Sequence, residues 1–434
     1  ILIANEGNQA ATPLQKHMHA HVDGHFVFLQ VSSVGMYFVK YLGADSNNLN
    51  GFTMKPGRVY LFSQGSTIKT PDGGALYYSD LVADFNEEIQ TIKLSFVAKI
   101  DEFTFRNGAI GIRDVKIAEG PGKLIGIMGA SGAGKTTLLN ILAGLEKPGK
   151  GTIKINGFDI HADKSKVEGV IGYVAQDDLL IEELTVYQNL YYNAKLCFAQ
   201  LKEAEIHERV MKALEDLGLD HRKDLKVGSI LDKQISGGQR KRLNIALELI
   251  REPAILFLDE PTSGLSSRDS ENVIDLLKEL SLKGKLIFVV IHQPSSDIYK
   301  MFDKMILMDT GGYPTYYGNP VAAVTYFKKA TNQVDSGRGQ CEVCGNVNPE
   351  QIFNIIEARV VDEYGQPTNK RKVTPMQWNE MFKNNFKPAF IEKTHEEPPQ
   401  SLHLPSRLGQ AIIFTTRNFL AKLSNKQYLL INLL

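Results

Sequence analysis

The sequence predicts an α/β protein built around a mostly parallel sheet, with a small all-β, sandwich-like domain in front of it. Two apolar runs, residues 254–258 and 286–291, are rich in branched side chains and do not alternate with polar residues. Strands that are buried on both faces show this pattern, as in parallel sheets. A third run, residues 124–128, leads through a glycine-rich loop into a helical pattern that begins near Lys135. This order of strand, loop and helix indicates a parallel α/β sheet.

The all-β domain is predicted to span residues 1–92. Within it, residues 17–85 alternate short β-prone runs with turn signals such as Pro56-Gly57. Four histidines lie near its start, three of them spaced as one face of a strand: His17, His19, His21 and His25. Solvated histidines explain this spacing better than a metal site does. We therefore expect a small packing or regulatory module here.

Composition limits the function classes. The 434 residues are 43% hydrophobic, which suits two or three globular domains. Lys+Arg and Asp+Glu are equal at 49 each, so no net charge favours nucleic acid, and none is expected as a partner. The three cysteines, Cys197, Cys341 and Cys344, form no disulfide framework, which favours the cytosolic side. Cys341 and Cys344 supply only half of a zinc site, so no metal is assigned to them.

Three regions follow the β domain. The α/β domain is predicted over residues 93–330, and residues 331–405 form an extension tied together by loops, because 363–375 is polar with scattered proline. In residues 406–434, apolar side chains fall on one helical face opposite basic ones, which predicts an amphipathic helix along a membrane. We expect a longer protein that enters a hydrophobic span within a few residues of Leu434.

The glycine-rich loop fits the phosphate-binding pattern G-x-x-x-x-G-K-[ST], between a strand and a helix as that motif requires. Its glycines let backbone N–H groups surround phosphate oxygens, and the helix N-terminus adds positive charge. Lys135 is expected to reach the β and γ phosphates of ATP, and the Thr136 hydroxyl to bind Mg²⁺. The predicted phosphate-binding residues are Gly129, Ala130, Ser131, Gly132, Ala133, Gly134, Lys135, Thr136 and Thr137.

Two carboxylates end the apolar run 254–258 at the sheet edge where α/β proteins bind ligands. Asp259 is expected to hold Mg²⁺ through water, and Glu260 to polarise the attacking water. An acidic pair after a strand is otherwise often a helix cap. Because the phosphate loop is present, a catalytic role for the pair is favoured over a helix cap.

Two further polar side chains are predicted at this edge. His292 follows the run 286–291 and is expected to contact the γ-phosphate, although a lone histidine is more often structural. Gln176 follows the apolar stretch 170–175 and is expected to contact the metal and the water, with a surface amide as the alternative. The catalytic set is thus Glu260, His292 and Gln176, and the metal set is Thr136, Gln176 and Asp259.

A second motif, Ile235 to Gln239 followed by Arg240-Lys241-Arg242, resembles the signature sequence of ABC ATPases. Ser236 and its glycines precede a predicted helix over 240–250, whose N-terminus would offer N–H donors to a phosphate. The resemblance implies an ABC-type P-loop NTPase with a helical signature subdomain. It also implies a head-to-tail dimer, in which the signature covers ATP held by the second copy. The signature residues are Ser236, Gly237, Gly238 and Gln239.

Within that superfamily the chain is similar to the G subfamily, of the White-type half-transporters. The similarity lies in residues 240–243, in Pro261 to Leu265, in His292 to Ser295 and in the tail 311–318. It implies an ATP-hydrolysing domain that precedes its own transmembrane domain, at the cytoplasmic face of the cell membrane. The amphipathic stretch would be the connecting helix between the two.

Other features of the resemblance concern single residues. Relatives usually carry Asp where this chain has Ser266, in a loop that crosses the dimer interface, so this departure bears on the coupling between the two ATP sites. Gln239 is the general ABC residue where many G-subfamily members have Glu. An aromatic residue upstream of the phosphate loop is expected to stack on adenine; Phe105 is favoured and Phe103 is the alternative.

The run Gly57 to Phe62 and the later Gly65 to Ile68 faintly resemble forkhead-associated domains, without the histidine and asparagine of that family. The leading hypothesis is ATP-driven movement of a substrate across a membrane. The rivals are a soluble ABC ATPase that acts on ribosomes or nucleic acid, and a nucleotide-dependent regulatory scaffold. Such soluble ATPases usually have two ATPase domains or a coiled-coil insertion, and the sequence predicts neither; Glu260 and His292 argue against the scaffold.

Overall fold

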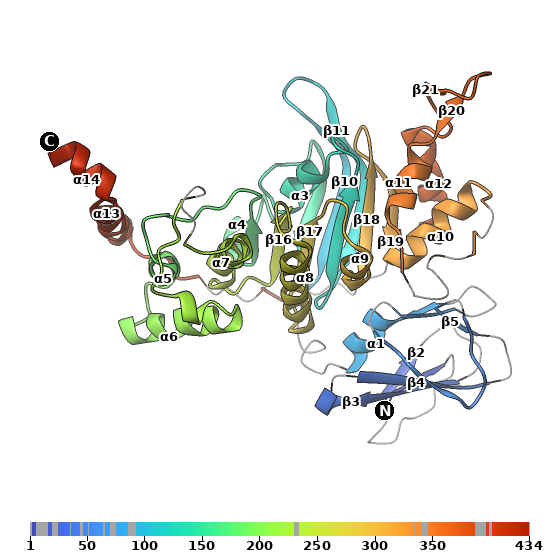
Figure 1. Ribbon diagram of the computed structural model, residues 1–434, viewed down its shortest axis with the longest axis horizontal. Coiled ribbons are helices and arrows are strands. Elements are labelled where there is room, and N and C mark those ends of the chain that lie inside the picture. The colour runs from blue at the N-terminus through green and yellow to red at the C-terminus, as the bar shows by residue number, and fades with distance from the viewer. Residues whose placement is uncertain are drawn as a thin grey trace.

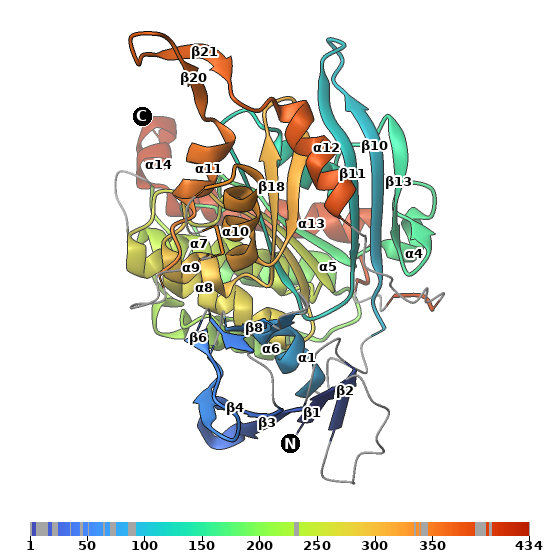
Figure 2. The same ribbon diagram turned by 90° about the vertical axis from the view of Figure 1, so that its right-hand side faces the viewer.

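The computed structural model describes residues 2–5, 16–19, 25–34, 36–43, 47–50, 52–63, 66–69, 75–85, 93–229, 234–333, 336–337, 339, 346–386, 396–398 and 402–433. A central α/β domain carries a helical region on one side and a C-terminal extension on the other, with the N-terminal domain below (Figure 1). Figure 2 shows the N-terminal domain at the same end of the molecule after a quarter turn. His21, Cys341 and Cys344 lie outside the described residues.

The N-terminal domain is strand-rich, as predicted. A five-stranded sheet has the order β2-β1-β3-β4-β7, and a four-stranded sheet has the order β6-β5-β8-β9. Along β3, Phe26 and Phe28 alternate inward and pack with Tyr41 and Phe62 in an aromatic core. The elements are β1 (Leu2–Asn5), β2 (Lys16–His19), β3 (His25–Val31), a short 3₁₀ turn (Ser32–Val34), β4 (Met36–Leu42), β5 (Asn48–Leu49), β6 (Phe52–Thr53), β7 (Val59–Leu61), β8 (Thr67–Lys69) and β9 (Ala75–Tyr77).

The prediction that this domain is entirely β is wrong at its end, where α1 (Tyr78–Phe85) is a helix. Its apolar residues Tyr78, Leu81, Val82 and Phe85 recur at the three- and four-residue spacing of one helical face and pack on the aromatic core. Leu282 of the central domain packs against the same core. The N-terminal domain thus contacts the α/β domain at Leu282.

The central domain has two sheets. The six-stranded sheet has the order β15-β16-β17-β12-β18-β19 and is parallel except for the β18–β19 pair, which confirms the mostly parallel prediction. Its strands are β12 (Leu124–Gly129), β15 (Ile171–Val174), β16 (Ile255–Asp259), β17 (Leu286–Val290), β18 (Lys304–Asp309) and β19 (Tyr313–Gly318). The second sheet, antiparallel, contains β10 (Phe96–Thr104), β11 (Ile110–Glu119), β13 (Lys150–Ile155) and β14 (Phe158–Asp159).

Helices cover both faces of the parallel sheet. The helix α3 (Lys135–Leu142) packs between the two sheets, where its apolar residues join one buried cluster. On the opposite face lie α8 (Ser267–Leu282), α9 (Ser296–Met301) and α10 (Pro320–Ala330), and α4 (Lys164–Val167) follows β14. Every residue of β12, β16 and β17 is buried, which explains why these runs lack polar alternation.

The helical region has a core of its own. It comprises α5 (Val186–Cys197), α6 (Glu203–Asp216), a 3₁₀ turn (Asp220–Arg222) and α7 (Gly237–Leu249). The predicted signature helix therefore exists, but it begins at Gly237 and not at Arg240. Ser236 caps it by accepting a hydrogen bond from the N–H of Gln239, which accepts one in return through its side chain. This capping box recruits both glycines into the first turn.

The C-terminal extension is more ordered than the loops that were predicted. It consists of α11 (Glu350–Ile356), the hairpin β20 (Arg359–Val361) and β21 (Pro367–Arg371), and α12 (Pro375–Asn385). Trp378 is fully buried and meets Phe327 of α10, with 5.1 Å between ring centroids. Arg371 donates to both carboxylate oxygens of Asp309 at the end of β18. Burial of one large aromatic side chain and one ion pair therefore fixes this polar segment to the central domain.

The last elements are α13 (Arg407–Ser424) and α14 (Lys426–Leu433). The predicted amphipathic helix is present, and its apolar residues Leu408, Ile412, Phe419 and Leu423 are exposed. Within the described residues, no helix has the length and apolar character that a membrane crossing requires.

Candidate functional site

The phosphate loop lies between β12 and α3. Gly132 and Gly134 adopt φ values of 75° and 90°, a left-handed backbone that favours glycine. Gly129 has no room for a side chain, since a Cβ would lie 2.5 Å from the carbonyl oxygen of Met308. The loop therefore turns sharply against β18, and α3 starts directly at Lys135.

Lys135 is buried, and its Nζ donates to the carbonyl oxygens of Gly129 at 3.1 Å and of Ala130 at 3.0 Å. Burial lowers the pKa of Lys135, while the carboxylates of Glu260 and Asp259 oppose that shift. The ammonium group thus lies within the loop, where its hydrogen-bond partners are carbonyls of the loop itself. An incoming phosphate would supply the anion that compensates its burial.

The two carboxylates lie next to the loop. Thr136 Oγ1 donates to Asp259 Oδ1 at 3.2 Å, and Gln176 Nε2 donates to Glu260 Oε2 at 3.3 Å. Burial raises the pKa of Asp259, which the hydrogen bond from Thr136 counteracts. The hydroxyl and carboxylate oxygens of Thr136 and Asp259 are hard ligands of the kind that Mg²⁺ prefers. Thr136 and Asp259 fit a magnesium ion, and two separate elements, α3 and β16, bring them together.

The backbone is strained where β16 and β17 end. Glu260 has φ 44° and Gln293 has φ 39°, both left-handed and neither glycine. The N–H of Glu260 donates to the carbonyl of Val290 at 3.1 Å, which ties the two strand ends together. Such strain persists only where surrounding contacts enforce it, and it gathers at functional sites. Here it aims the carboxylate of Glu260 at Gln176.

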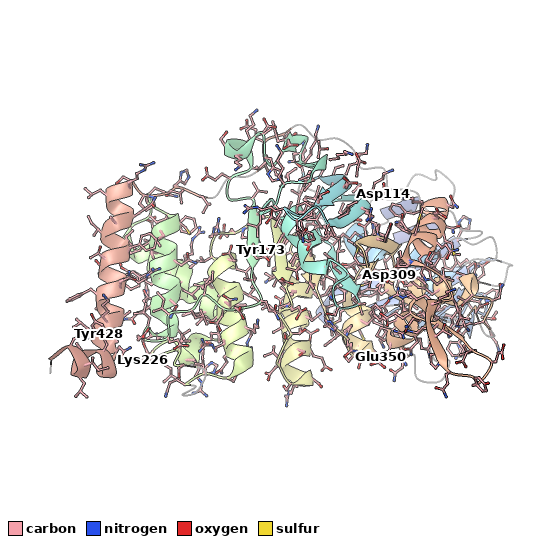
Figure 3. All side chains as sticks on the ribbon, turned by 90° about the horizontal axis from the view of Figure 1, so that it is seen from above. Asp114, Tyr173, Lys226, Asp309, Glu350 and Tyr428 are labelled. Atoms are coloured by element: carbon pink, nitrogen blue, oxygen red, sulfur yellow. The ribbon has the colours of Figure 1, made fainter. Side chains whose placement is uncertain are left out.

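His292 lies on a cavity of about 370 Å³ beside the phosphate loop. Gly129, Ala130 and Ser131 line one wall, and Ile291, His292 and Gln293 line another. The remaining wall comes from the extension, through Glu350, Phe353, Asn354 and Glu357 of α11 and the residue that follows it. Figure 3 shows Glu350 and Asp309 on the side of the molecule opposite α13. Sequence reasoning missed this wall, because α11 is brought to the loop only by packing.

The two candidate aromatic residues differ in exposure. Phe103 is 7% exposed and belongs to the core, whereas Phe105 is 43% exposed and meets Phe103 edge to face. Phe105 borders Gly111, whose carbonyl oxygen lies 3.0 Å from where a Cβ on Gly134 would be. The accessible ring near the phosphate loop is therefore Phe105, which supports the favoured assignment.

The signature residues stand apart from this cluster. Within the described residues, no hydrogen bond or ion pair joins residues 236–239 to residues 129–137. Apart from the N–H of Gln239, which donates to Ser236, the first N–H groups of α7 have no partner inside the helix, as at any helix start, and they can donate to an anion. The chain thus carries a phosphate loop and a separate potential phosphate-binding helix end.

Known proteins share the part of the chain that carries both the phosphate loop and the signature helix. The ABC transporter family model matches residues 112–263, which contain the phosphate loop, the signature and both carboxylates. These residues form an ABC transporter domain. A second model, described as ABC-2 type transporter, matches residues 292–403. Both matches lie after the N-terminal domain.

Two curated relatives show which branch of the ABC transporters this domain resembles. It is 41% identical over 269 residues to the putative white-brown complex homolog protein 30 of Arabidopsis thaliana, covering 61% of this chain and 24% of that protein. It is 36% identical over 269 residues to ABC transporter G family member 14 of Arabidopsis thaliana, covering 60% and 40%. The chain thus spans less than half of these relatives, and its similarity to the G subfamily is confirmed.

Other matches extend beyond plants. A probable ATP-dependent permease of Saccharomyces cerevisiae is 39% identical over 273 residues, covering 60% of this chain and 25% of that protein. The solved structure of cbiO1 from Clostridium perfringens, described as part of an ABC transporter complex, covers 55% of this chain and 95% of its own at 27% identity, with a TM-score of 0.46.

The departure of this ABC chain at Ser266 has a local explanation. Ser266 is the N-cap of α8 and accepts a hydrogen bond from the N–H of Asp269. Its Oγ also donates to Asp269 Oδ2 at 2.8 Å. The carboxylate of Asp269, one helical turn later in the chain, thus lies within hydrogen-bond distance of Ser266. The other oxygen of Asp269 lies 2.7 Å from where a Cβ on Gly238 would be, so α8 packs directly on the signature.

Replacing Lys135 in this ABC chain by alanine should weaken ATP binding about 10- to 150-fold, as expected for a lost hydrogen bond to a charged group. Calorimetric titration with Mg-ATP measures the change. Lys147→Ala is the control, since Lys147 lies exposed on the loop after α3 and should bind ATP like the wild type. Equal affinities for the two variants would remove Lys135 from the phosphate site.

Proposed function

We propose that this chain binds and hydrolyses ATP with Mg²⁺ to drive the movement of a substrate across a membrane, from the cytoplasmic face. The observation that carries the proposal is the convergence of Lys135, the Thr136–Asp259 pair and the Gln176–Glu260 pair at one edge of the parallel sheet. The separate signature helix provides the second feature that an ABC-type site requires.

Each residue has a defined task in this proposal. Backbone N–H groups of the phosphate loop and the Lys135 ammonium hold the phosphates. Thr136 and Asp259 would hold a magnesium ion, which would supply positive charge to the β and γ phosphates. Glu260 accepts the proton of the attacking water, and Gln176 and His292 orient the water and the γ-phosphate. Phe105 offers its ring to adenine.

The site needs a second copy of the chain. Within the part of the chain that the structure describes, Ser236, Gly237 and Gly238 make no hydrogen bond to the phosphate loop of their own chain, and the α7 start is capped only by its own Ser236–Gln239 pair. A head-to-tail homodimer would place the signature of each copy over the ATP of the other. The γ-phosphate would then be gripped by both copies.

Contacts of α13 support a route from this site to a membrane. This helix packs on α5 of the helical region. Lys226 Nζ donates to the carbonyl of Ser424 at 2.9 Å, and Asn425 Nδ2 donates to Glu183 Oε1 at 3.1 Å. Figure 3 shows Lys226 close to the end of α13, near Tyr428. Movement of the helical region would therefore carry α13, whose apolar residues are free to meet a bilayer or membrane helices.

ATP should drive dimerisation of the Glu260→Gln variant. We expect a larger dimer fraction with Mg-ATP than with Mg-ADP, because only ATP supplies the γ-phosphate that both copies bind and slow turnover preserves it. Sedimentation velocity with each nucleotide measures the fractions. Adding Ser236→Arg should abolish the difference, since a bulky cation then fills the helix start. Equal dimer fractions at saturating nucleotide would exclude a shared site.

A further inference from the structure

We propose that Lys241 is a positioning residue, which ties the signature helix α7 to the backbone of Gln176 and so couples a chain's own ATP site to the signature that it offers to its partner. The inference rests on the proposed function and deepens it. It concerns a residue that touches neither phosphate nor metal in the roles described above.

The tie is a direct hydrogen bond. Lys241 Nζ donates to the carbonyl oxygen of Gln176, and the side chain of Gln176 in turn donates to Glu260 at 3.3 Å. Lys241 lies on the second turn of α7, shortly after Ser236 to Gly238. A continuous path therefore runs from the proposed general base, through one residue, to the helix that carries the signature.

Arg240 strengthens this junction. Its Nε and Nη2 donate to the two carboxylate oxygens of Asp178 at 2.8 and 3.1 Å, and its Nη1 donates to the carbonyl of Gly228. Arg240 is buried, so this bidentate pair holds residues 176–178 in place beside α7. Two consecutive cations of one helix thus clamp one short segment.

The two cations have different partners and hence different tasks. Within residues 176–178, Arg240 binds the side chain of Asp178 and fixes where the segment lies. Lys241 binds the backbone of the one residue whose amide reaches Glu260, so it would transmit a displacement of that residue. Lys241 is half-buried; burial lowers its pKa, and the carboxylates Asp178, Asp177, Glu260 and Asp259 oppose that shift. These four carboxylates thus lie around the Lys241 side chain, at the acidic edge of the site.

A rigid tie has a consequence for two coupled sites. When ATP changes the position of Gln176 in one copy, the Lys241 bond transfers the change to α7 of the same copy. That α7 would cover the ATP of the partner. Loss of the bond should then leave each phosphate loop able to bind ATP but uncouple the binding of ATP from the placement of the signature.

The test uses Lys241→Met in the full chain, with Lys241→Arg as the conservative variant and Arg242→Met as the matched control. Arg242 is the next cation on α7 and makes no hydrogen bond or ion pair within the described part of the chain. We expect ATP affinity of Lys241→Met to stay within about twofold of wild type and kcat to fall about tenfold, the lower end for a bond to a charged group. The Hill coefficient for ATP should move towards one.

Amide hydrogen exchange gives a readout that does not depend on hydrolysis. In Lys241→Met, residues 176–179 should exchange faster, and ATP should no longer alter exchange at the start of α7. Lys241→Arg should restore both kcat and protection in part, and Arg242→Met should match the wild type. Unchanged exchange and kcat in Lys241→Met, or an equal loss in Arg242→Met, would overturn the inference. A wild-type chain without ATPase activity would instead refute the proposed function. The exchange pattern would still show whether the Lys241–Gln176 hydrogen bond links residues 176–179 to α7.

Discussion

Replacing Glu260 by glutamine should leave ATP binding intact and lower turnover about 10²- to 10⁴-fold, the usual range for the loss of a general base. Glutamine keeps the shape of the side chain but cannot accept a proton from water. The phosphate-binding groups, Lys135 and the loop backbone, are untouched. The effect should therefore appear in kcat and not in the dissociation constant of ATP.

Single-turnover phosphate release and equilibrium binding of Mg-ATP separate the two quantities. Glu215→Gln is the control, because Glu215 is exposed on α6, far along the chain from the sheet edge. It should behave like the wild type in both measurements. A Glu260→Gln chain that turns over at the wild-type rate would refute the role given to Glu260, and one that loses ATP affinity would show that Glu260 supports the phosphate loop.

Replacing Asp303 by alanine should destabilise the chain by about 3–5 kcal/mol, the usual cost of leaving one partner of a buried ion pair alone. Asp303 Oδ1 accepts from Lys278 Nζ at 2.6 Å, and Asp303 Oδ2 accepts from the N–H of Leu124 at 2.7 Å. The side chains of Lys278 and Asp303 are only 9% and 3% exposed. The substitution removes the anion, leaves a buried ammonium group and leaves the first N–H of β12 without its acceptor.

Urea unfolding followed by circular dichroism measures the loss. Glu279→Ala breaks the exposed Lys283–Glu279 pair, whose side chains are 57% and 63% exposed, and should change stability by less than about 1 kcal/mol. Adding Lys278→Met to Asp303→Ala should recover part of the loss, since the uncompensated cation is then gone. An Asp303→Ala chain as stable as Glu279→Ala would contradict the importance of this pair.

This second effect should not reach the ATP site. Asp303 precedes β18 and bonds the first residue of β12, so it lies at the opposite end of these parallel strands from Lys135. The folded fraction of Asp303→Ala should bind Mg-ATP with wild-type affinity. The Asp303 prediction thus tests the stability of the sheet, and the Glu260 prediction tests the catalytic residues at its other edge.

Much of the central domain could be predicted from the sequence because its signals are local. The strands 124–129, 255–259 and 286–290 are fully buried, and burial on both faces leaves a continuous apolar run. The phosphate loop depends on glycines at fixed spacing, and their positive φ angles agree with that requirement. Glu260 and His292 were predicted because they lie just past such strands, Asp259 because it ends one, and Gln176 because it follows the apolar stretch 170–175.

The sequence by itself determined the class of sheet, the phosphate loop, the ABC resemblance and which residue types meet at the sheet edge, since these depend on short periodicities and motif spacing. Only the tertiary structure decided which partner each side chain has. The Lys241–Gln176 bond, the α11 wall beside His292 and the Asp303–Lys278 pair join residues far apart in the chain or on separate elements. The helix at Tyr78 to Phe85 and the ordered extension around Trp378 likewise depend on the cores that they pack against. Such contacts form when packing, and not local propensity, selects the conformation. A local pattern such as the apolar spacing in residues 78–85 is compatible with a helix, but it does not report which residues that helix meets.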